Sequence, residues 1–236
     1  MMARMSASES IAAPGAGQPT STRPYRQVRA VFDDATITVY QAYEPGIALA
    51  AIRRGRFSPS YDRTRMTWIK PSFLWMMYRC GWAQKPQQEH VLAIRLTRPG
   101  FEAALAQGTL SHFDPAVHTS PEAWAATGHS PVRIQWDPER DLYLRPLDHR
   151  AIQIGLSGAA VDAYCDEWIV GIDDVTALAH EIHGLVRERA YDKANALLPA
   201  EAPYPLSPEL AASIGATMRG PGPGGVEPPG PERERV

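Results

Sequence analysis

The residues whose types and spacing could do chemistry lie in the run RMTWIKPSF, which begins at Arg65. The pattern predicts a short strand that passes into a helix, and proline suits the first helical position because its missing N–H has no partner there. The first-turn amides and the Ser72 hydroxyl would then face outward at the positive end of the helix, just after Arg65 and Lys70. This combination predicts a phosphate-binding site. The alternative is an ordinary junction in which Lys70 is solvated.

The elements that must position this junction are a strand at 66–69 and a helix at 73–82, which is apolar on almost every side. Such a helix is typical of a buried position. Several other segments alternate or are rich in β-branched residues, and so predict strands. These segments are 27–32, 36–43, 90–96, 132–136, 142–144 and 151–156. Two more helices are predicted at 47–54 and 174–198.

The order of these elements, strands first and helices later, predicts an α+β fold. We expect a single compact domain at 24–219, with a mixed, mainly antiparallel sheet flanked by helices. Residues 1–23 and 220–236 are rich in small, Pro, Gly or charged residues and are expected to be disordered. The sequence has no glycine-rich dinucleotide fingerprint, no GxxxxGK[ST] phosphate loop and no GxSxG nucleophile elbow.

The composition argues against several classes of protein. The formal net charge is −2, so no overall basic field would attract nucleic acid, although a local basic patch is compatible with it. Two cysteines, Cys80 and Cys165, provide neither a disulfide framework nor a four-cysteine metal site. No apolar run approaches the roughly 18 to 20 residues that span a bilayer, and no signal-like segment follows Arg4. We therefore expect a cytoplasmic protein with no membrane partner and no structural metal.

Histidines offer a weaker case for chemistry. His180 and His183 are three residues apart on an expected helix, whereas the zinc-protease motif needs a spacing of four. A solvated helix face is the better interpretation. Three histidines between 108 and 130 have no metal-ligand spacing. Loops of that length are uncommon in compact domains, so the segment is a candidate lid or substrate loop.

Several unusual runs carry a resemblance to a known family. They are VYQAY at 39–43, RMTWIKPSFLWMMYRCGW at 65–82, and QWDPER at 135–140, followed by QIGL at 153–156. Over about residues 25–180 the chain resembles the family of domains of unknown function numbered 4291. The resemblance is specific in sequence, and the family name implies no activity.

The order of elements is more distantly similar to the ADP-ribosyltransferase-like fold, which implies a split sheet and NAD as cofactor. VYQAY would occupy a strand where Gln41 stands in place of a common His. Arg65 to Lys70 would form the second strand, with Tyr78 in the next helix, where an aromatic ring lies under the nicotinamide. Gln153 stands where the catalytic Glu is expected, and Gln cannot act as a carboxylate base.

Some branches of that superfamily lack the catalytic Glu and place basic residues around a phosphate, as the RNA 2′-phosphotransferases do. The resemblance implies this role for four cations, which are Arg29, Arg65, Lys70 and Arg79. In the run QWDPER, Trp136 would offer a stacking face and Asp137 a hydroxyl acceptor. A structural turn is an equal alternative for that run.

Together these observations make Gln41, Lys70 and Gln153 the expected catalytic residues. The expected ligand-binding residues are Arg29, Tyr40, Tyr43, Arg65, Thr67, Trp68, Ser72, Tyr78, Arg79, Trp136 and Asp137. The expected function is a nucleotide-binding transferase that acts on NAD or on an RNA or nucleotide phosphate. The alternative is a non-catalytic module that binds nucleic acid or a protein partner through the same groove.

Overall fold

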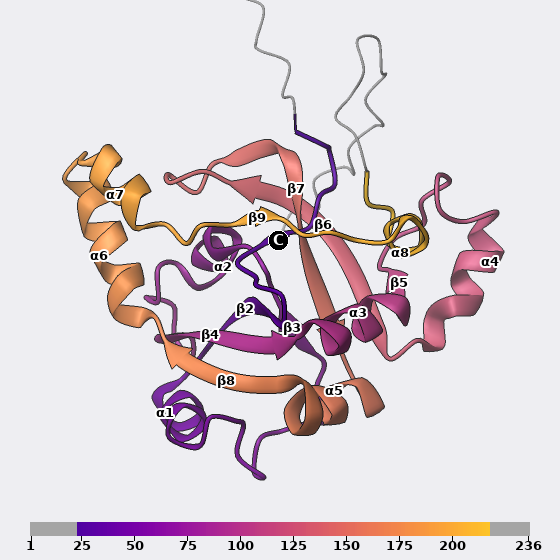
Figure 1. Ribbon diagram of the computed structural model, residues 1–236, viewed down its shortest axis with the longest axis horizontal. Coiled ribbons are helices and arrows are strands. Elements are labelled where there is room, and N and C mark those ends of the chain that lie inside the picture. Colours follow the sequence, from indigo (N-terminus) through magenta and orange to yellow (C-terminus); the bar gives the residue numbers. More distant parts are fainter. Residues whose placement is uncertain (1–22, 218–236) are drawn as a thin grey trace, which may run out of the picture.

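Two β-sheets position the candidate site, and a backbone bridge between Tyr40 and Lys70 joins them (Figure 1). The structure is a computed structural model that describes residues 23–217. The tails expected at 1–23 and 220–236 lie outside this range, apart from Arg23. The described residues form a single α+β domain with mostly antiparallel sheets, and this confirms the predicted fold class.

The first sheet is antiparallel throughout and has the order β2-β4-β8. Its strands are β2 (Thr36–Tyr43), β4 (His90–Thr97) and β8 (Ile169–Asp174). The second sheet has the order β3-β7-β6-β5, and only its β5–β6 pair is parallel. Its strands are β3 (Thr67–Ile69), β5 (Gly108–Leu110), β6 (Val132–Arg140) and β7 (Pro146–Leu156). A smaller sheet pairs β1 (Arg29–Ala30) with β9 (Ala202–Pro203).

Helices flank these sheets in the described part of the chain. They are α1 (Pro45–Arg54), α2 (Phe73–Cys80), α3 (Arg98–Ala106), α4 (Pro121–Ala126), α5 (Ala159–Ala163), α6 (Thr176–Arg187), α7 (Tyr191–Leu197) and α8 (Pro208–Ser213). Figure 1 shows α6 and α7 at one edge of the molecule and α4 at the opposite edge, while β9 crosses between them beside the N-terminal segment. The Thr217 N–H donates to the Arg26 carbonyl at 2.7 Å, so the two ends of the described range lie together.

Helix α2 follows the expected junction directly. The Ser72 hydroxyl caps it by accepting from the Trp75 N–H at 3.1 Å, and Gly81 ends it in the left-handed conformation, which glycine adopts without strain. Met76 and Met77 are buried, with no more than 2% of either exposed. The predicted buried helix is therefore confirmed, and it ends at Cys80.

Alternation along the strands builds the core. On β2, Ile37, Val39 and Gln41 are buried at every second position, and the first two pack in a cluster that joins both sheets. A second cluster packs α2 against Ile182 of α6 and its neighbours. Each large apolar side chain buried in this way contributes roughly 1.5 to 3 kcal/mol to stability. Gln41 continues the buried face, so its amide needs partners inside the protein.

The structure differs from the predicted elements in several places, one of which is the strand predicted at 142–144, since these residues lie in the turn between β6 and β7. The helix predicted at 174–198 is two helices, because Arg189 lies at φ +61 and turns the chain between α6 and α7. Strand β8 was not predicted, since its sequence IVGIDD carries a glycine and two aspartates that resemble a turn. The strand predicted at 27–32 is reduced to β1, which pairs with β9, while Phe32 forms only a single antiparallel bridge with Ile37 of β2.

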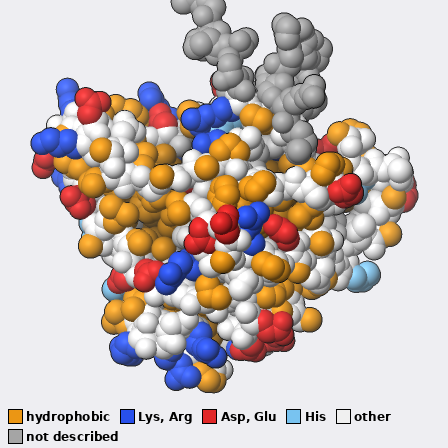
Figure 2. Space-filling view, in the orientation of Figure 1, with side chains coloured by type: hydrophobic (Ala, Val, Ile, Leu, Met, Phe, Trp, Pro, Cys, Tyr) orange, Lys and Arg blue, Asp and Glu red, His pale blue; other side chains and the backbone are white. Residues whose placement is uncertain are grey.

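Acidic and basic side chains are interspersed over the face shown in Figure 2, with apolar groups between them. This mixture agrees with the net charge of −2. On this face, any attraction of an anionic ligand must therefore come from a local arrangement of cations and not from the field of the whole face.

Candidate functional site

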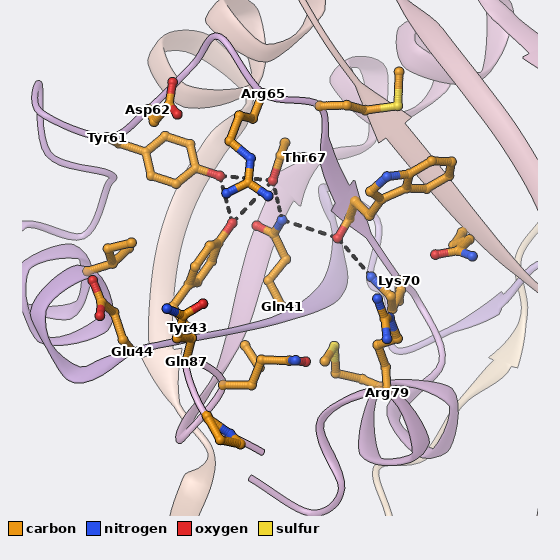
Figure 3. Close-up of a pocket in the computed structure, with 18 of the residues that line it drawn as sticks. Gln41, Tyr43, Glu44, Tyr61, Asp62, Arg65, Thr67, Lys70, Arg79 and Gln87 are labelled. Atoms are coloured by element: carbon orange, nitrogen blue, oxygen red, sulfur yellow. Dashed lines mark hydrogen bonds between the residues drawn. The ribbon is translucent and has the colours of Figure 1, made fainter. Parts of the chain in front are cut away.

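A cavity of about 710 Å³, called the main cavity below, lies where the two sheets meet. Strands β2 and β3, helix α2, the loop at 86–88 and strands β6 and β7 all contribute side chains to it. Figure 3 shows Arg65, Lys70 and Arg79 directed toward the same space, with hydroxyl and amide groups between them. The structure thus brings distant segments into one polar, partly basic site.

Eight residues expected from the sequence line the main cavity. They are Gln41, Tyr43, Arg65, Thr67, Trp68, Lys70, Arg79 and Gln153. All three residues predicted to be catalytic are among them. The bridge between β2 and β3 explains this convergence, because it places the VYQAY strand beside the strand that leads into the junction.

The floor of the main cavity holds hydroxyl groups and an amide in mutual contact (Figure 3). The hydroxyl oxygens of Tyr43 and Tyr61 lie 2.7 Å apart, and each lies within about 3.1 Å of Thr67 Oγ1. Gln41 Nε2 donates to Thr67 Oγ1 at 2.7 Å and to the Trp68 carbonyl, while Tyr164 donates to Gln41 Oε1. Both N–H groups of Gln41 are therefore engaged by the protein. Its amide ties the sheets together and leaves little capacity for a ligand.

Lys70 is buried at 5% exposure, and its ammonium donates to the Trp68 carbonyl at 3.0 Å. This corrects the alternative in which Lys70 is solvated. Burial, followed by repulsion from the Arg79 guanidinium, lowers the pKa of Lys70 from 10.5 to about 7. A buried amine with this pKa can gain or lose a proton near neutral pH, which is what acid–base catalysis requires.

Arg65 and Arg79 are exposed side chains that line the mouth of the main cavity. Among the ion pairs within residues 23–217, neither arginine takes part. Their guanidinium groups are therefore free for an incoming anion. Glu44 and Asp62 also line the cavity, so its wall is not uniformly basic.

Gln153 is held by a carboxylate beside the main cavity. Its Nε2 donates to Asp137 Oδ2 at 2.7 Å, and Gln135 Nε2 donates to Asp137 Oδ1 at 2.9 Å. These residues face one another across β6 and β7, where Gln135 pairs with Gln153. The carboxylate of Asp137 therefore lies one hydrogen bond away from the position at which the resemblance expects a Glu.

Ser72 does not lie in the main cavity. It lines a second cavity of about 240 Å³, where its hydroxyl donates to Glu139 Oε1 at 2.9 Å. The Phe73 N–H, expected to be free, donates to Glu201 Oε1 at 2.7 Å. The predicted anion site at the start of α2 is thus corrected, because the side chains of Glu139 and Glu201 already take up the Ser72 hydroxyl and the Phe73 N–H at that helix end.

Burial raises the pKa of Glu201 to about 8, and the nearby Glu139 carboxylate adds to the effect. The folded protein then binds this proton more tightly than the unfolded chain does, so the contribution of Glu201 to stability falls as pH rises from 4.5 to 8.

Replacing Glu201 by Gln is expected to leave the melting temperature nearly unchanged at about pH 5 and to raise it by about 3 to 8 °C at about pH 9. The Gln side-chain oxygen still accepts from the Phe73 N–H, so the helix end keeps its partner. Thermal melts over this pH range measure the effect, with the exposed Glu188→Gln as control. A constant difference between variant and wild type at all pH values would contradict it.

The remaining expected ligand-binding residues lie away from the main cavity. Tyr40 is buried against the ring of Phe73, and Arg29 lines the second cavity. Tyr78 is exposed on another face of α2, where the Arg140 guanidinium lies 3.6 Å from its ring centre. Trp136 packs against the core and donates to the Ile214 carbonyl at 2.8 Å. Tyr78, the aromatic residue expected under the nicotinamide, therefore does not line the main cavity.

Sequence reasoning missed several residues of both cavities. Tyr61 belongs to a segment that reads as a plain loop, although its sequence SYDR does hold an aromatic residue between polar ones. Gln87 lines the main cavity from a turn after α2. Glu139 lies within the run QWDPER, and no feature of the sequence indicates a buried carboxyl group there. Glu201 comes from a segment more than a hundred residues away from α2.

The segment 108–130 contains β5 and α4, and none of its residues lines either cavity, so a lid over the main cavity is not supported. His183 stacks on the Trp82 ring at 5.4 Å. Within residues 23–217, no three His, Cys, Asp or Glu side chains are grouped closely enough to hold a metal ion. None of the helices in that range combines the length and apolarity that a bilayer crossing requires.

Comparison with models of protein families identifies the family of this chain. The sequence model of a family described as "Domain of unknown function (DUF4291)" matches residues 27–204. No curated protein matches the chain. The matched range includes all the residues that line the main cavity.

Proposed function

Because the chain belongs to the DUF4291 family, whose function is unknown, we propose from the site itself that it is a nucleotide-binding enzyme of ADP-ribosyltransferase-like type. It acts on NAD or on the phosphate of an RNA or nucleotide. In this proposal the main cavity is the binding site, and the enzyme works in the cytoplasm, since Cys80 and Cys165 are free thiols, as is usual in reducing compartments.

The observation that carries this proposal is the convergence of Arg65, Lys70 and Arg79 on one cavity, where none of them forms an ion pair with a carboxylate of residues 23–217. Arginine binds phosphate through a planar fork of donors, and lysine binds it as a point charge. The indole of Trp68 and the amide of Gln153 line the same space and suit a nucleobase or a ribose. A phosphate together with a planar polar ring is the chemistry of a nucleotide.

Proton transfer falls to Lys70 in this proposal. Gln153 cannot act as a base, and the Asp137 carboxylate behind it accepts hydrogen bonds from two glutamines. A neutral amine at the floor of the cavity can accept the proton of an attacking hydroxyl or water. Arg65 and Arg79 would hold the phosphate and stabilise the charge that develops during transfer.

The first test is a thermal-shift screen of single nucleotides, NAD and RNA oligomers. We expect a selective rise in melting temperature with a small nucleotide or NAD, since binding to the folded state alone stabilises it by mass action. Arg79→Gln should lose the response, whereas the exposed Arg53→Gln on α1 should keep it. The absence of a response to every small ligand would overturn the proposal.

The alternative function is a non-catalytic module that binds nucleic acid or a protein partner. The observation in its favour is that the side-chain amides of Gln41 and Gln153 already donate hydrogen bonds to other residues of the same chain. A module of this kind would respond to polymeric RNA and not to mononucleotides in the same screen, and its affinity would fall steeply with salt.

Gln153→Glu alone would place two carboxylates against each other, because Gln153 donates to Asp137. The pair Gln153→Glu with Asp137→Asn restores one donor and one acceptor and leaves a carboxylate facing the cavity. If the site is built like that of an ADP-ribosyltransferase, NAD hydrolysis should appear in the double variant and be weaker in the single variant. Release of nicotinamide, followed by chromatography, measures it. Equal, background-level hydrolysis in all forms would leave no support for NAD as the substrate.

A further inference from the structure

The three cations of the main cavity lie at different depths. Arg65 and Arg79 are exposed, whereas Lys70 is buried at 5% exposure and turns its ammonium toward the Trp68 carbonyl. The backbone of Lys70 is also fixed, since it exchanges hydrogen bonds with Tyr40 where the two sheets meet. Lys70 is therefore an amine held in a fixed place deep in the cavity, while the two arginines of the same cavity are open to solvent.

We propose that the main cavity selects a terminal phosphate monoester, which reaches Lys70 between Arg65 and Arg79, and that its binding adds one proton to the Lys70 amine. This inference rests on the proposed nucleotide-binding function and narrows it. The favoured ligand is a nucleotide or an RNA end with a terminal phosphate, and not NAD or an internal phosphodiester.

The depth of Lys70 is the reason for selecting a monoester. A terminal phosphate has one covalent attachment, so it can enter the cavity end-on with three oxygens free for donors. A phosphodiester has substituents on both sides, and it would have to bring both of them past the arginines to contact Lys70. A monoester also carries a charge of about −1.5 to −2 at neutral pH, against −1 for a diester.

The proton follows from what surrounds the amine. Arg79 of α2 disfavours the ammonium form of Lys70, while Asp137 of β6 and Cys80 of α2 favour it weakly. Arg65, from the loop before β3, lines the same cavity. Burial and Arg79 prevail, and they lower the pKa of Lys70 to about 7. A phosphate dianion beside the amine favours the ammonium form and raises the pKa of Lys70. The –NH₂ group then takes up a proton from solvent and becomes –NH₃⁺.

The test uses adenosine 5′-monophosphate and its methyl ester, which share the nucleoside and differ in one phosphate oxygen. Isothermal titration at about pH 8 in buffers with different ionisation enthalpies counts the protons taken up on binding. For the wild type we expect the monoester to bind at least about tenfold more tightly than the ester, with uptake of nearly one proton. The exposed Lys193→Met on α7 should behave like the wild type.

The matched variant is Lys70→Met, which keeps the length of the side chain and removes its charge. We expect it to fold and to melt at or above the wild-type temperature, because an apolar side chain replaces a buried amine. It should lose the preference for the monoester and take up no proton. If the monoester binds without proton uptake, or no better than the ester, the inference is wrong and the proposed function stands. If neither nucleotide binds while the protein is folded, both are wrong.

Discussion

Replacing Met77 by Asp should lower the free energy of unfolding by roughly 3 to 5 kcal/mol, enough to unfold a marginal domain at ambient temperature. Met77 is completely buried in the cluster that packs α2 against α6 and α7. An aspartate there must either be buried as an anion or take up a proton, and both are unfavourable. Urea unfolding followed by circular dichroism measures the loss.

Two matched variants make this prediction specific. Met77→Leu keeps the apolar volume and should change stability by less than about 1.5 kcal/mol. Met76→Asp should be less harmful than Met77→Asp, because Met76 lines the main cavity together with Lys70 and Arg79, whose charges favour a carboxylate. Equal losses at the two methionines would show that the cavity is not positively charged in the way described.

The second large effect is expected on affinity. The double variant Arg65→Gln with Arg79→Gln removes two cations at the mouth of the cavity, and each charge-assisted bond to phosphate is worth roughly 1.5 to 3 kcal/mol. We expect nucleotide affinity to fall by about a hundredfold to ten-thousandfold. Both side chains are exposed and make no ion pair within the described range, so the melting temperature should stay near that of the wild type.

Isothermal titration of the double variant provides the measurement. The control is Arg53→Gln with Arg54→Gln, two exposed arginines at the end of α1 whose loss removes the same charge from the surface. If the control loses as much affinity as the test variant, the attraction comes from overall charge. The main cavity would then have no special role in binding.

The fold class could be predicted from the sequence because the patterns that specify it are local. The buried faces of β2 and α2 follow from periodicity, and Ser72 and Gly81 mark the limits of that helix. Strand β8 and the break at Arg189 could not be predicted in this way. Strand β8 depends on its pairing with β4, a distant segment that outweighs the local preferences of IVGIDD. At Arg189 a left-handed residue interrupts a helical pattern that continues through the sequence.

The candidate site was predictable where the chain reaches it through consecutive residues. Arg65, Thr67, Trp68 and Lys70 lie together on β3 and its flanks, and the structure keeps them together in the main cavity. The role of the residues at the start of α2 could not be predicted in this way. Its free amides and the Ser72 hydroxyl are locally suited to an anion, but Glu139 and Glu201 reach them from far along the chain. The local sequence does not show which distant residues will contact such a helix end in the folded protein.

The most direct test of the central claim is a crystal structure of the protein soaked with adenosine 5′-monophosphate. We expect density for the phosphate in the main cavity, within hydrogen-bonding distance of Lys70 Nζ and between the guanidinium groups of Arg65 and Arg79, with the adenosine toward Trp68. An empty main cavity at saturating ligand, or a nucleotide bound only elsewhere on the protein, would contradict the account.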